Sequence, residues 1–408
     1  MIHIAVLGFG TVGGGVAELI EENGAQVAAA VGEPVKVKYV LVRRDYPGSP
    51  YADRMVRDMN VILNDPEVKV VCEAIGGIEP ALSYARAALE KGIHFCTSNK
   101  ELIDAHGPEL CAMARAHGRS CLFEASVAGG IPILRTLRTS LRQEDVASVT
   151  GILNGTCNYI LTKMDREGMA FADALRQAQE QGFAEQDPTA DVEGRDTARK
   201  LAILASMISG GRVSSAQIPC QGITGVDRLD LLYAKKLNGA IKLLGLCDRD
   251  ANGVSVRVAP CLVLSGHPLY GVGDVFNGVV VRGNMAGDLT LAGRGAGRRP
   301  TASAVVSDLI ECLNARGQTL DAGLTGNAIS VTAGPRHPSR CFFRAGAGEE
   351  GQARKLFGGD LAPVQIDEAK GEFAFTAPPL TVQEIEEKAG ALKTLKNKFL
   401  IMEGSMKN

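Results

Sequence analysis

A chain of 408 residues, 45% of them hydrophobic, is long enough to form two or three domains. Its formal net charge of −2 at pH 7 disfavours a nucleic-acid-binding protein without sequence preference, because such proteins need a basic surface. No apolar run can cross a bilayer, no signal-peptide pattern opens the chain, and the ten cysteines lack CxxC spacing. We therefore expect a cytoplasmic protein with reduced thiols and with no nucleic-acid or membrane partner.

The first predicted strand, residues 2–7, is followed by the turn GFGTVG and a predicted helix over residues 12–22. This is the GxGxxG spacing of dinucleotide-binding proteins, in its strand–turn–helix setting. The first glycine permits a tight turn, the second lets the backbone approach a pyrophosphate, and the third lets the helix pack closely on the strand. Free N–H groups at the start of the helix would bind the phosphates. The residues predicted to hold the cofactor here are Gly8, Gly10, Thr11, Val12 and Gly13.

A second predicted strand, residues 35–42, ends in a cluster of charges that bears on the cofactor. An acidic residue at this place binds the ribose 2′-hydroxyl of NAD, whereas an arginine favours the 2′-phosphate of NADP. Arg43 therefore indicates NADP, while Asp45 leaves NAD open. The simpler alternative is a solvated charge cluster at the end of a strand.

Strands and helices continue to alternate, which predicts a parallel, doubly wound sheet. Further strands are predicted over residues 68–74, 93–97 and 120–124, and further helices over residues 80–91 and 109–117. Ser98 and Lys100 follow the strand at 93–97, just beyond its carboxyl end, where such sheets bind ligands. Lys100 is therefore a candidate to contact a substrate or a nicotinamide, although one lysine in a loop can equally be a solvated charge.

The segment GFAEQDPTADVEGRDTARKL is the most chemically dense part of the chain. It follows a predicted strand at 146–153, a predicted helix that begins after Tyr159 and ends at Glu167, and a predicted helix at 171–181. Asp196 and Lys200 are four residues apart on a helix predicted to begin near Asp191, so they share one face. They could be an exposed ion pair, but an apolar run over residues 201–208 follows them directly. In a partly dry cleft, a lysine and carboxylates can act as acid, base or ammonium-binding groups.

The second half of the chain predicts an α+β domain. A helix is expected over residues 229–237 and strands over 241–248, 254–258 and 278–284. A helix over 300–314 is expected to return to the nucleotide-binding domain, and residues 327–338 are a predicted linker. The tail predicts strands at 341–345, 362–367, 372–376 and 398–403 and helices at 351–357 and 381–392. This βαββαβ order is typical of a ferredoxin-like module.

Several of these motifs together resemble homoserine dehydrogenase over residues 2–325. They are GFGTVGGGV, SNKEL, FEASVAGGIPI, GILNGTCNYIL, GFAEQDPTADVEGRDTARKL and AGRGAGRRPTASAVVSDL. The resemblance implies a homodimer or homotetramer that interconverts L-homoserine and L-aspartate 4-semialdehyde with NADP or NAD. The resemblance implies that this reaction belongs to threonine, methionine and isoleucine biosynthesis. It oxidises the CH–OH group of homoserine in one direction and re-forms it by reduction in the other.

The resemblance also implies roles for residues, and Lys200 matches the catalytic acid/base, with Asp196 as its carboxylate partner. Lys100 matches a lysine between nicotinamide and substrate, and Glu185 and Asp191 match residues that bind the substrate amine and hydroxyl. Gly297 matches a late glycine near the cofactor. Backbone carbonyls would form a structural sodium site, because an oxygen-only site suits an alkali ion better than zinc. Its residues are Glu124, Val127, Gly129 and Ile131.

The predicted fold is α/β, with a Rossmann-type nucleotide-binding domain, an α+β substrate and dimerisation domain, and a small module. The domains are expected at 1–135 (completed by a helix at 298–325), 136–297 and 340–408. The module occupies the place of the ACT domain of many family members. Its first strand–helix turn carries Glu349 and Glu350, which would disfavour an amino-acid effector's carboxylate.

Two alternatives to this function are open. The family usually has threonine where this chain has Cys157, so an aldehyde dehydrogenase that forms a thiohemiacetal on this thiol is one alternative. A non-enzymatic NAD(P)-binding regulator is the other. The presence of Lys100, Asp196 and Lys200 disfavours it.

Overall fold

The computed structural model describes residues 1–334, 337–358 and 360–404, and the chain divides into two compact units. Unit 1 comprises Met1–Gln143, Ala202–Ser214 and Arg294–Ile329; unit 2 comprises Glu144–Leu201, Ser215–Gly293 and Ser330–Asn408. The division into three domains made from the sequence stays a prediction. No helix of the described residues is long and apolar enough to cross a membrane.

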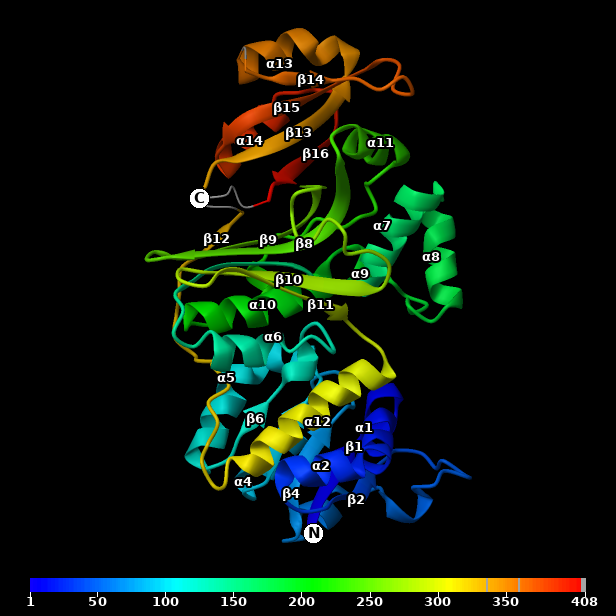
Figure 1. The fold of residues 1–408 in the computed structure, drawn as a ribbon, viewed down its shortest axis with the longest axis vertical. Coiled ribbons are helices and arrows are strands. Elements are labelled where there is room, and N and C mark those ends of the chain that lie inside the picture. The colour runs from blue at the N-terminus through cyan, green and yellow to red at the C-terminus, as the bar shows by residue number, and fades with distance from the viewer. Residues whose placement is uncertain (335–336, 359, 405–408) are drawn as a thin grey trace. The chain divides into compact units, whose positions relative to one another are not determined.

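Unit 1 contains a six-stranded parallel sheet with strand order β3-β2-β1-β4-β5-β6. This is the order of a doubly wound dinucleotide-binding sheet, and it confirms the predicted fold class. Figure 1 shows its strands in blue and cyan. The strands are β1 (Ile2–Leu7), β2 (Val35–Leu41), β3 (Met55–Val56), β4 (Val68–Glu73), β5 (His94–Thr97) and β6 (Cys121–Leu122).

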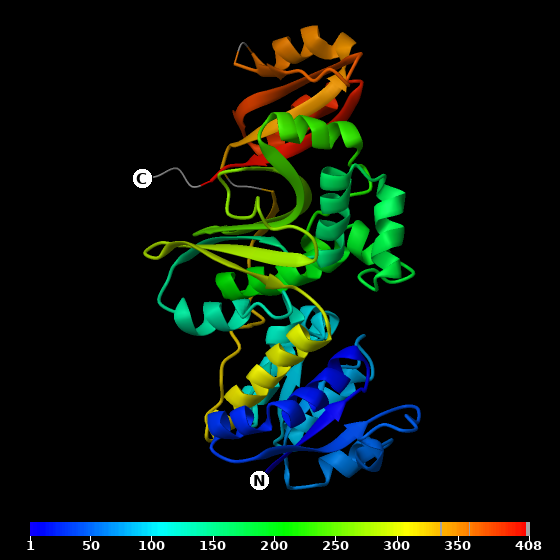
Figure 2. The ribbon, with the colours of Figure 1, turned by 45° about the vertical axis from the view of Figure 1, so that its right-hand side comes forward.

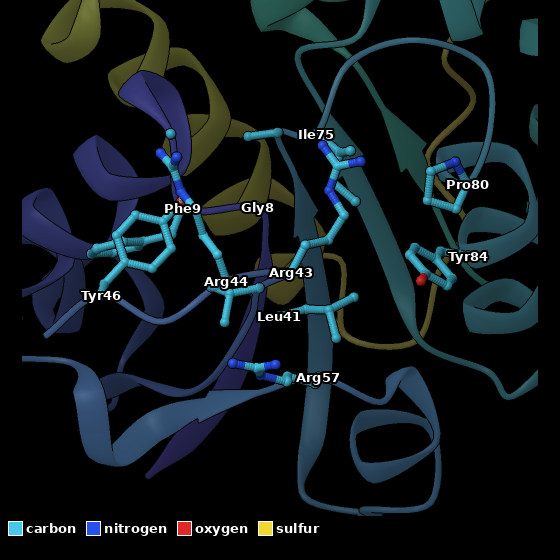
Figure 3. Close-up of a pocket in the computed structure, with 13 residues that line it drawn as sticks. Gly8, Phe9, Leu41, Arg43, Arg44, Tyr46, Arg57, Ile75, Pro80 and Tyr84 are labelled. Atoms are coloured by element: carbon cyan, nitrogen blue, oxygen red, sulfur yellow. Dashed lines mark hydrogen bonds between the residues drawn. The ribbon is translucent and has the colours of Figure 1, made fainter.

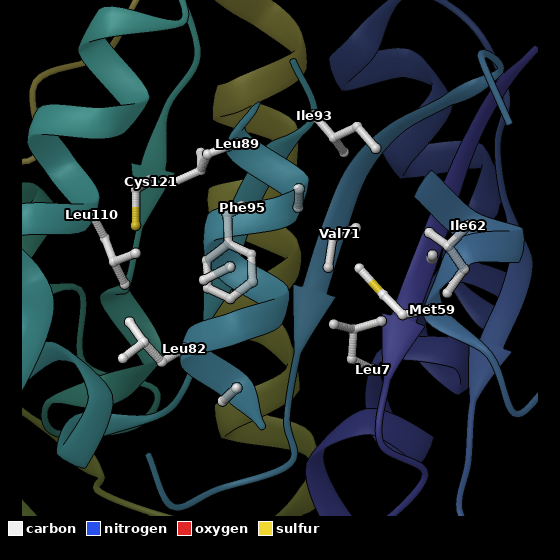
Figure 4. Close-up of a cluster of buried hydrophobic side chains, with 14 of the residues drawn as sticks. Leu7, Met59, Ile62, Val71, Leu82, Leu89, Ile93, Phe95, Leu110 and Cys121 are labelled. Carbon is white, nitrogen blue, oxygen red and sulfur yellow. The ribbon is translucent and has the colours of Figure 1, made fainter. Parts of the chain in front are cut away.

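Helices flank this sheet and bury an apolar core against it. Side chains from three neighbouring strands, Leu7, Val71 and Phe95, pack with Leu82 and Leu110 from two helices (Figure 4). The helices of unit 1 are α1 (Thr11–Glu22), α2 (Gly24–Val31), α3 (Met59–Leu63), α4 (Ala81–Glu90), α5 (Lys100–Ala116), α6 (Ile133–Arg135) and α12 (Arg298–Asn314). Helix α12 packs on α1, as predicted for the returning helix: a Cβ at Gly15 would lie 2.9 Å from the carbonyl oxygen of Arg298.

Two predicted boundaries in unit 1 are wrong. Helix α5 begins at Lys100 and not after Pro108, although a proline inside a helix costs about 3 kcal/mol. A side-chain cap from Asn99 and the buried residues Leu102 and Ile103 of the first turns offset that cost. The strand predicted to reach Glu124 ends at Leu122, and Glu124 begins a short 3₁₀ turn instead.

Unit 2 is built on one mixed sheet, which among the described residues has ten strands. Its order is β11-β10-β7-β8-β9-β16-β13-β15-β14, and β12 also pairs with β9. Two strands went unpredicted: β11, and β12, which lies inside the expected linker. The strands are β7 (Val146–Ile152), β8 (Gly239–Asp250), β9 (Gly253–Leu264), β10 (Phe276–Gly283), β11 (Gly287–Arg294), β12 (Val331–Ala333), β13 (Ser339–Gly346), β14 (Ala362–Val364), β15 (Glu372–Leu380) and β16 (Leu395–Met402).

The helices near the chemically dense segment differ from the expected single helix. The short helix α9 ends at Val192, and α10 begins at Arg195. Gly194, with a φ of +83°, interrupts the helical conformation between them. A left-handed residue of this kind favours glycine. Helices α7 and α8 lie side by side (Figures 1 and 2). Helix α10 contributes residues to both units. The helices not yet given are α7 (Gly155–Glu167), α8 (Phe171–Glu180), α9 (Thr189–Val192), α10 (Arg195–Ser209), α11 (Arg228–Lys236), α13 (Glu350–Phe357) and α14 (Val382–Gly390).

The tail has the predicted βαββαβ order, and its strand order β16-β13-β15-β14 is that of a split βαβ module. Its edge is not free, however. Strand β16 pairs in parallel with β9, with Leu400 opposite Cys261. One apolar cluster joins Leu244 of β8 to Phe343 and Phe375 of the tail. The sheets of the tail and of the preceding domain are therefore one sheet.

Arg344 on β13 fastens the tail to helix α11. Its side chain is only 4% exposed, and its guanidinium donates to both oxygens of Asp227, at 2.7 and 2.6 Å, and to a carboxylate oxygen of Asp230. Its Nε also forms an ion pair with Glu372 at 2.8 Å. Asn397 of β16 donates to the other oxygen of Asp230 at 2.6 Å. Burial raises the pKa of Asp230 to about 6, against the lowering effect of the Asp227 N–H and of Arg344.

Replacing this cation should be costly in a pH-dependent way. We expect Arg344→Met to lower the free energy of unfolding by about 3–5 kcal/mol, because it leaves buried carboxylates without their cation. The loss should be larger at pH 8 than at pH 5. Asp230 has a folded-state pKa of about 6, above the value of about 3.9 in an unfolded chain. It is therefore largely protonated in the folded protein at pH 5 and must bury a charge at pH 8.

Urea unfolding at both pH values measures this loss. The matched control is Arg354→Met, which removes an exposed ion pair with Glu350 and should change stability by no more than about 0.5 kcal/mol. Equal losses in the two variants, or a loss in Arg344→Met that does not grow with pH, would contradict the expectation.

Candidate functional site

The glycine-rich turn of unit 1 opens onto a cavity of about 530 Å³ at the carboxyl ends of β1, β2 and β4. Gly8 has a φ of +92°, and a Cβ there would lie 2.8 Å from the carbonyl oxygen of Ala74. A Cβ at Gly13 would lie 2.0 Å from the carbonyl oxygen of Gly8. Gly10 is the N-cap of α1 and brings no capping side chain, so the first N–H groups of the helix, from Thr11 onward, can receive phosphate oxygens. The turn thus fits a dinucleotide.

Three arginines line the part of this cavity beyond β2 (Figure 3). The guanidinium of Arg44 lies 5.3 Å from the ring centroid of Tyr46, and Arg57 pairs with Asp45 at 2.6 Å. Within the described part of the chain, Arg43 forms no ion pair. Asp45 is thus held by Arg57 and does not line the cavity. Arg44 and Arg57 were not predicted as lining residues, and Arg57 lies in no motif that could have indicated it.

Lys100 and Gly297 both lie at the N-termini of helices of unit 1. Lys100 is the first residue of α5, not a loop residue, and follows the N-cap Asn99. Gly297 is the N-cap of α12 with a φ of +116°. Ser98 donates its N–H to the carbonyl oxygen of Glu73 at 3.3 Å and so lies beside the carboxyl end of β4.

The predicted pair of unit 2 forms a tight hydrogen-bonded group. The Lys200 Nζ donates to Asp196 Oδ2 at 2.7 Å and to the carbonyl oxygen of Leu153 at 2.8 Å. The Nδ2 of Asn154 donates to the same Asp196 oxygen at 2.8 Å and to Asp191 Oδ1 at 2.6 Å. The side chain of Asp196 is only 5% exposed and that of Lys200 11%. This is a partly dry cluster and not an exposed ion pair.

Two residues around this group differ from expectation. Asn154 was missed, although an asparagine directly after a strand and before a helix is a signal for an N-cap; its Oδ1 accepts from the N–H of Cys157 at 2.8 Å. The side chain of Glu185 is exposed and stands outside the hydrogen-bonded group, while its backbone oxygen accepts from Gln179 at 3.0 Å. The structure thus joins Asp191, but not Glu185, to the Asp196–Lys200 pair.

Cys157 does not have the environment of a nucleophile. Its thiol is buried and donates to the carbonyl oxygen of Asp191 at 3.1 Å. Burial, and then the charges of Asp191 and Asp196, raise its pKa well above the ordinary value. Since the thiolate is the reactive form, this cysteine acts as a small packed residue.

The segment with the predicted carbonyl site is buried in unit 1. The two carboxylate oxygens of Glu124 accept from the N–H groups of Leu134 and Arg135, at 2.9 and 2.6 Å. Ala128 and Gly129 both have a positive φ, of 56° and 53°. Since its carboxylate caps α6, Glu124 could offer an ion its backbone oxygen, together with those of Val127, Gly129 and Ile131. No cluster of three or more potential metal-binding side chains occurs in the described residues.

Family profiles, sequence relatives and solved structures that resemble this chain all carry the same family name. The family profiles "Homoserine dehydrogenase, NAD binding domain" and "Homoserine dehydrogenase" match residues 8–124 and 132–310. The chain is 43% identical to the homoserine dehydrogenase of Synechocystis sp. over 316 residues, which are 76% of this chain and 72% of that relative. A crystal structure of a homoserine dehydrogenase from Thiobacillus denitrificans is similar with a TM-score of 0.89 at 31% identity, covering 98% of each chain. A hyperthermophilic archaeal homoserine dehydrogenase in complex with NADPH is similar over 76% of this chain and 97% of that one, with a TM-score of 0.66 at 28% identity.

The burial of the thiols can be tested directly with Ellman's reagent. Cys220 is exposed and the other nine cysteines are buried, so the folded protein should show one fast-reacting thiol. Cys220→Ser should remove the fast phase, and Cys157→Ser should leave it unchanged. All ten thiols should react in denaturant. A fast phase that disappears in Cys157→Ser would show that this thiol is reactive after all.

Proposed function

This chain belongs to the homoserine dehydrogenase family, and we propose which of its residues carry out the reaction. It is an NAD(P)-dependent oxidoreductase that acts on the CH–OH group of homoserine and interconverts L-homoserine and L-aspartate 4-semialdehyde, a step of amino-acid biosynthesis. The observation that carries the proposal is the buried group of Asn154, Asp196 and Lys200. Neither the Cys157 thiol mechanism nor the non-enzymatic regulator is favoured.

Lys200 is proposed as the group that moves the hydroxyl proton. A lysine ammonium carries three hydrogens, and two of them point at Asp196 and at the carbonyl oxygen of Leu153. The third is left for the substrate oxygen, directly or through a water molecule. In the reductive direction Lys200 donates this proton to the developing alkoxide; in the oxidative direction its neutral form accepts the proton. The nicotinamide, when bound, supplies or accepts the hydride.

The remaining polar residues are proposed to hold the substrate. Asp191, fixed by Asn154, would neutralise the substrate ammonium together with Glu185. Lys100 would stabilise the negative charge that develops on the substrate oxygen. These roles follow the family resemblance, and the hydrogen bonds of Asp191 and Asp196 support them because they fix both carboxylates before a substrate binds.

NADP is proposed as the preferred cofactor. Arg43, Arg44 and Arg57 line the cavity beyond β2, and Asp45, the acid that follows these strand-end arginines, is engaged by Arg57. Guanidinium groups bind a phosphate with paired, charge-assisted hydrogen bonds. The related archaeal enzyme in complex with NADPH is consistent with this preference.

A structural sodium ion on the carbonyl oxygens of Glu124, Val127, Gly129 and Ile131 is also proposed. The positive φ of Ala128 and Gly129, which turns successive carbonyls, supports it. The homodimer or homotetramer and the cytoplasmic location stay predictions.

The role of Lys200 can be tested by substitution. Lys200→Met should lower kcat by about 10²-fold or more, the usual scale for a general acid–base group, while leaving cofactor affinity near normal. Initial rates of homoserine-dependent NADP reduction measure this. The matched control is Lys163→Met, which removes another lysine–carboxylate pair four residues apart and should leave kcat unchanged. A Lys200→Met enzyme with near-normal kcat would remove Lys200 from its role.

The cofactor preference predicts a selective loss. Arg43→Ala and Arg57→Ala should each raise KM for NADP about 10- to 100-fold and change KM for NAD little, because each removes a charged partner of the 2′-phosphate. Arg54→Ala is the control, since Arg54 pairs with Glu21 and does not line the cavity. Equal losses for both cofactors, or a wild-type enzyme with a much higher kcat/KM for NAD, would show that these arginines do not read the phosphate.

A further inference from the structure

Glu73, the last residue of β4, holds a central place in the sheet of unit 1. It pairs with Leu7, the residue before the glycine-rich turn, and with Thr97 at the end of β5. The strand order turns back between β1 and β4, and doubly wound sheets bind their ligand at this switch point. A fully buried carboxylate, 0% exposed, therefore lies at the point of the sheet where the cofactor is expected.

Three donors hold this carboxylate. Its Oε1 accepts from the N–H groups of Ile75 and Gly76, at 2.5 and 3.2 Å, and its Oε2 accepts from the Thr97 hydroxyl at 2.5 Å. Burial raises the pKa of Glu73, and these hydrogen bonds oppose that shift. Within the described residues it has no cationic partner. Because all three neighbours donate, the arrangement suits an ionised carboxylate.

The bonds continue from Glu73 to the start of α5. The Thr97 hydroxyl oxygen accepts from the N–H of Asn99 at 2.9 Å. Asn99 caps α5 through its Oδ1, which accepts from Leu102 at 3.1 Å, and its Nδ2 donates to the carbonyl oxygen of Gly77 at 2.5 Å. Lys100 is the next residue. The segment 74–77, which supplies two lining residues of the cofactor cavity, and the first turn of α5 are thus tied to one carboxylate.

We propose that Glu73 is a positioning residue of this enzyme that also favours the oxidised form of the cofactor. Its hydrogen bonds fix the cavity segment 74–77 and, through Thr97 and Asn99, the place of Lys100. Its unpaired negative charge at the switch point stabilises the oxidised nicotinamide, which is positively charged, more than the neutral reduced ring. The inference rests on the proposed function in that it takes the cavity as the cofactor site and Lys100 as a catalytic group.

Two substitutions at Glu73 separate the charge from the shape. Glu73→Gln keeps an oxygen for the N–H groups of Ile75 and Gly76 but removes the charge. It should raise the dissociation constant of oxidised NADP about three- to tenfold and leave that of NADPH nearly unchanged. Glu73→Asp keeps the charge on a shorter side chain, so it should leave the ratio of the two constants unchanged and lower kcat. Fluorescence titration with each cofactor form, without substrate, measures the constants.

The control removes a carboxylate that lies before β4, and a further variant tests the same hydrogen-bond network. Asp65→Asn removes a carboxylate bonded by Lys38 and Tyr39 before the opposite end of β4 and should leave both the ratio and kcat unchanged. Thr97→Val breaks the link between Glu73 and Asn99. It should therefore lower kcat and leave the ratio of the two dissociation constants unchanged. It serves as a second test if Glu73→Gln does not fold.

The outcomes decide between roles. The proposal is supported if the ratio of the two dissociation constants changes in Glu73→Gln and in none of the other variants. An unchanged ratio in a folded Glu73→Gln protein, or a normal kcat in both Glu73→Asp and Thr97→Val, overturns it. The wild-type protein is assayed in parallel for homoserine-dependent NADP reduction. Absence of that activity would overturn the proposed function, while the binding ratio would still report on Glu73.

Discussion

The site of unit 2 depends on one constraint: the carboxylate of Asp196 is almost entirely withdrawn from water. A buried charge costs several kcal/mol unless a countercharge and hydrogen bonds compensate it. Lys200, one turn later on α10, supplies the charge, and Asn154, at the start of α7, supplies a second donor. If either partner moved away, the buried charge of Asp196 would lose a compensating interaction and the folded state would be destabilised. The lysine that is to handle a proton is therefore held in place by the same energetics that keep its carboxylate dry.

The parts of the fold and site that the sequence predicted are those whose signal is local. The order of the predicted strands and helices in unit 1 follows from alternating apolar segments, although α2, β3 and α3 were not predicted. The glycine spacing identified the cofactor turn. The spacing of Asp196 and Lys200 predicted their shared face because a helix repeats over that distance. The βαββαβ order of the tail was recovered in the same way.

The parts that escaped prediction depend on residues far apart in the chain. Asn154 joins the site only because β7 ends beside α10, and Arg57 reaches the cofactor cavity from a segment after β2. Pro108 predicted a helix boundary, yet the cap and the buried face of α5 outweighed it. The pairing of β16 with β9 was equally invisible, since edge strands carry no local mark of their partner. This pairing joins the sheet of the C-terminal tail to the sheet of the preceding domain, which the sequence predicted as separate modules.

The way the outer edge of β9 is covered has a consequence for synthesis of the chain. Segments that arrive at different times pair along that edge: Cys220 opposite Val258 first, then β12 along Val254–Val256, and β16 along Cys261–Val263 last. Because the ribosome delivers these segments in sequence, we expect the apolar part of this edge at Cys261–Val263 to stay open until β16 has emerged. Such an edge can pair with another chain. The order in which the native sheet covers β9 is thus also the order in which an aggregation-prone surface disappears during translation.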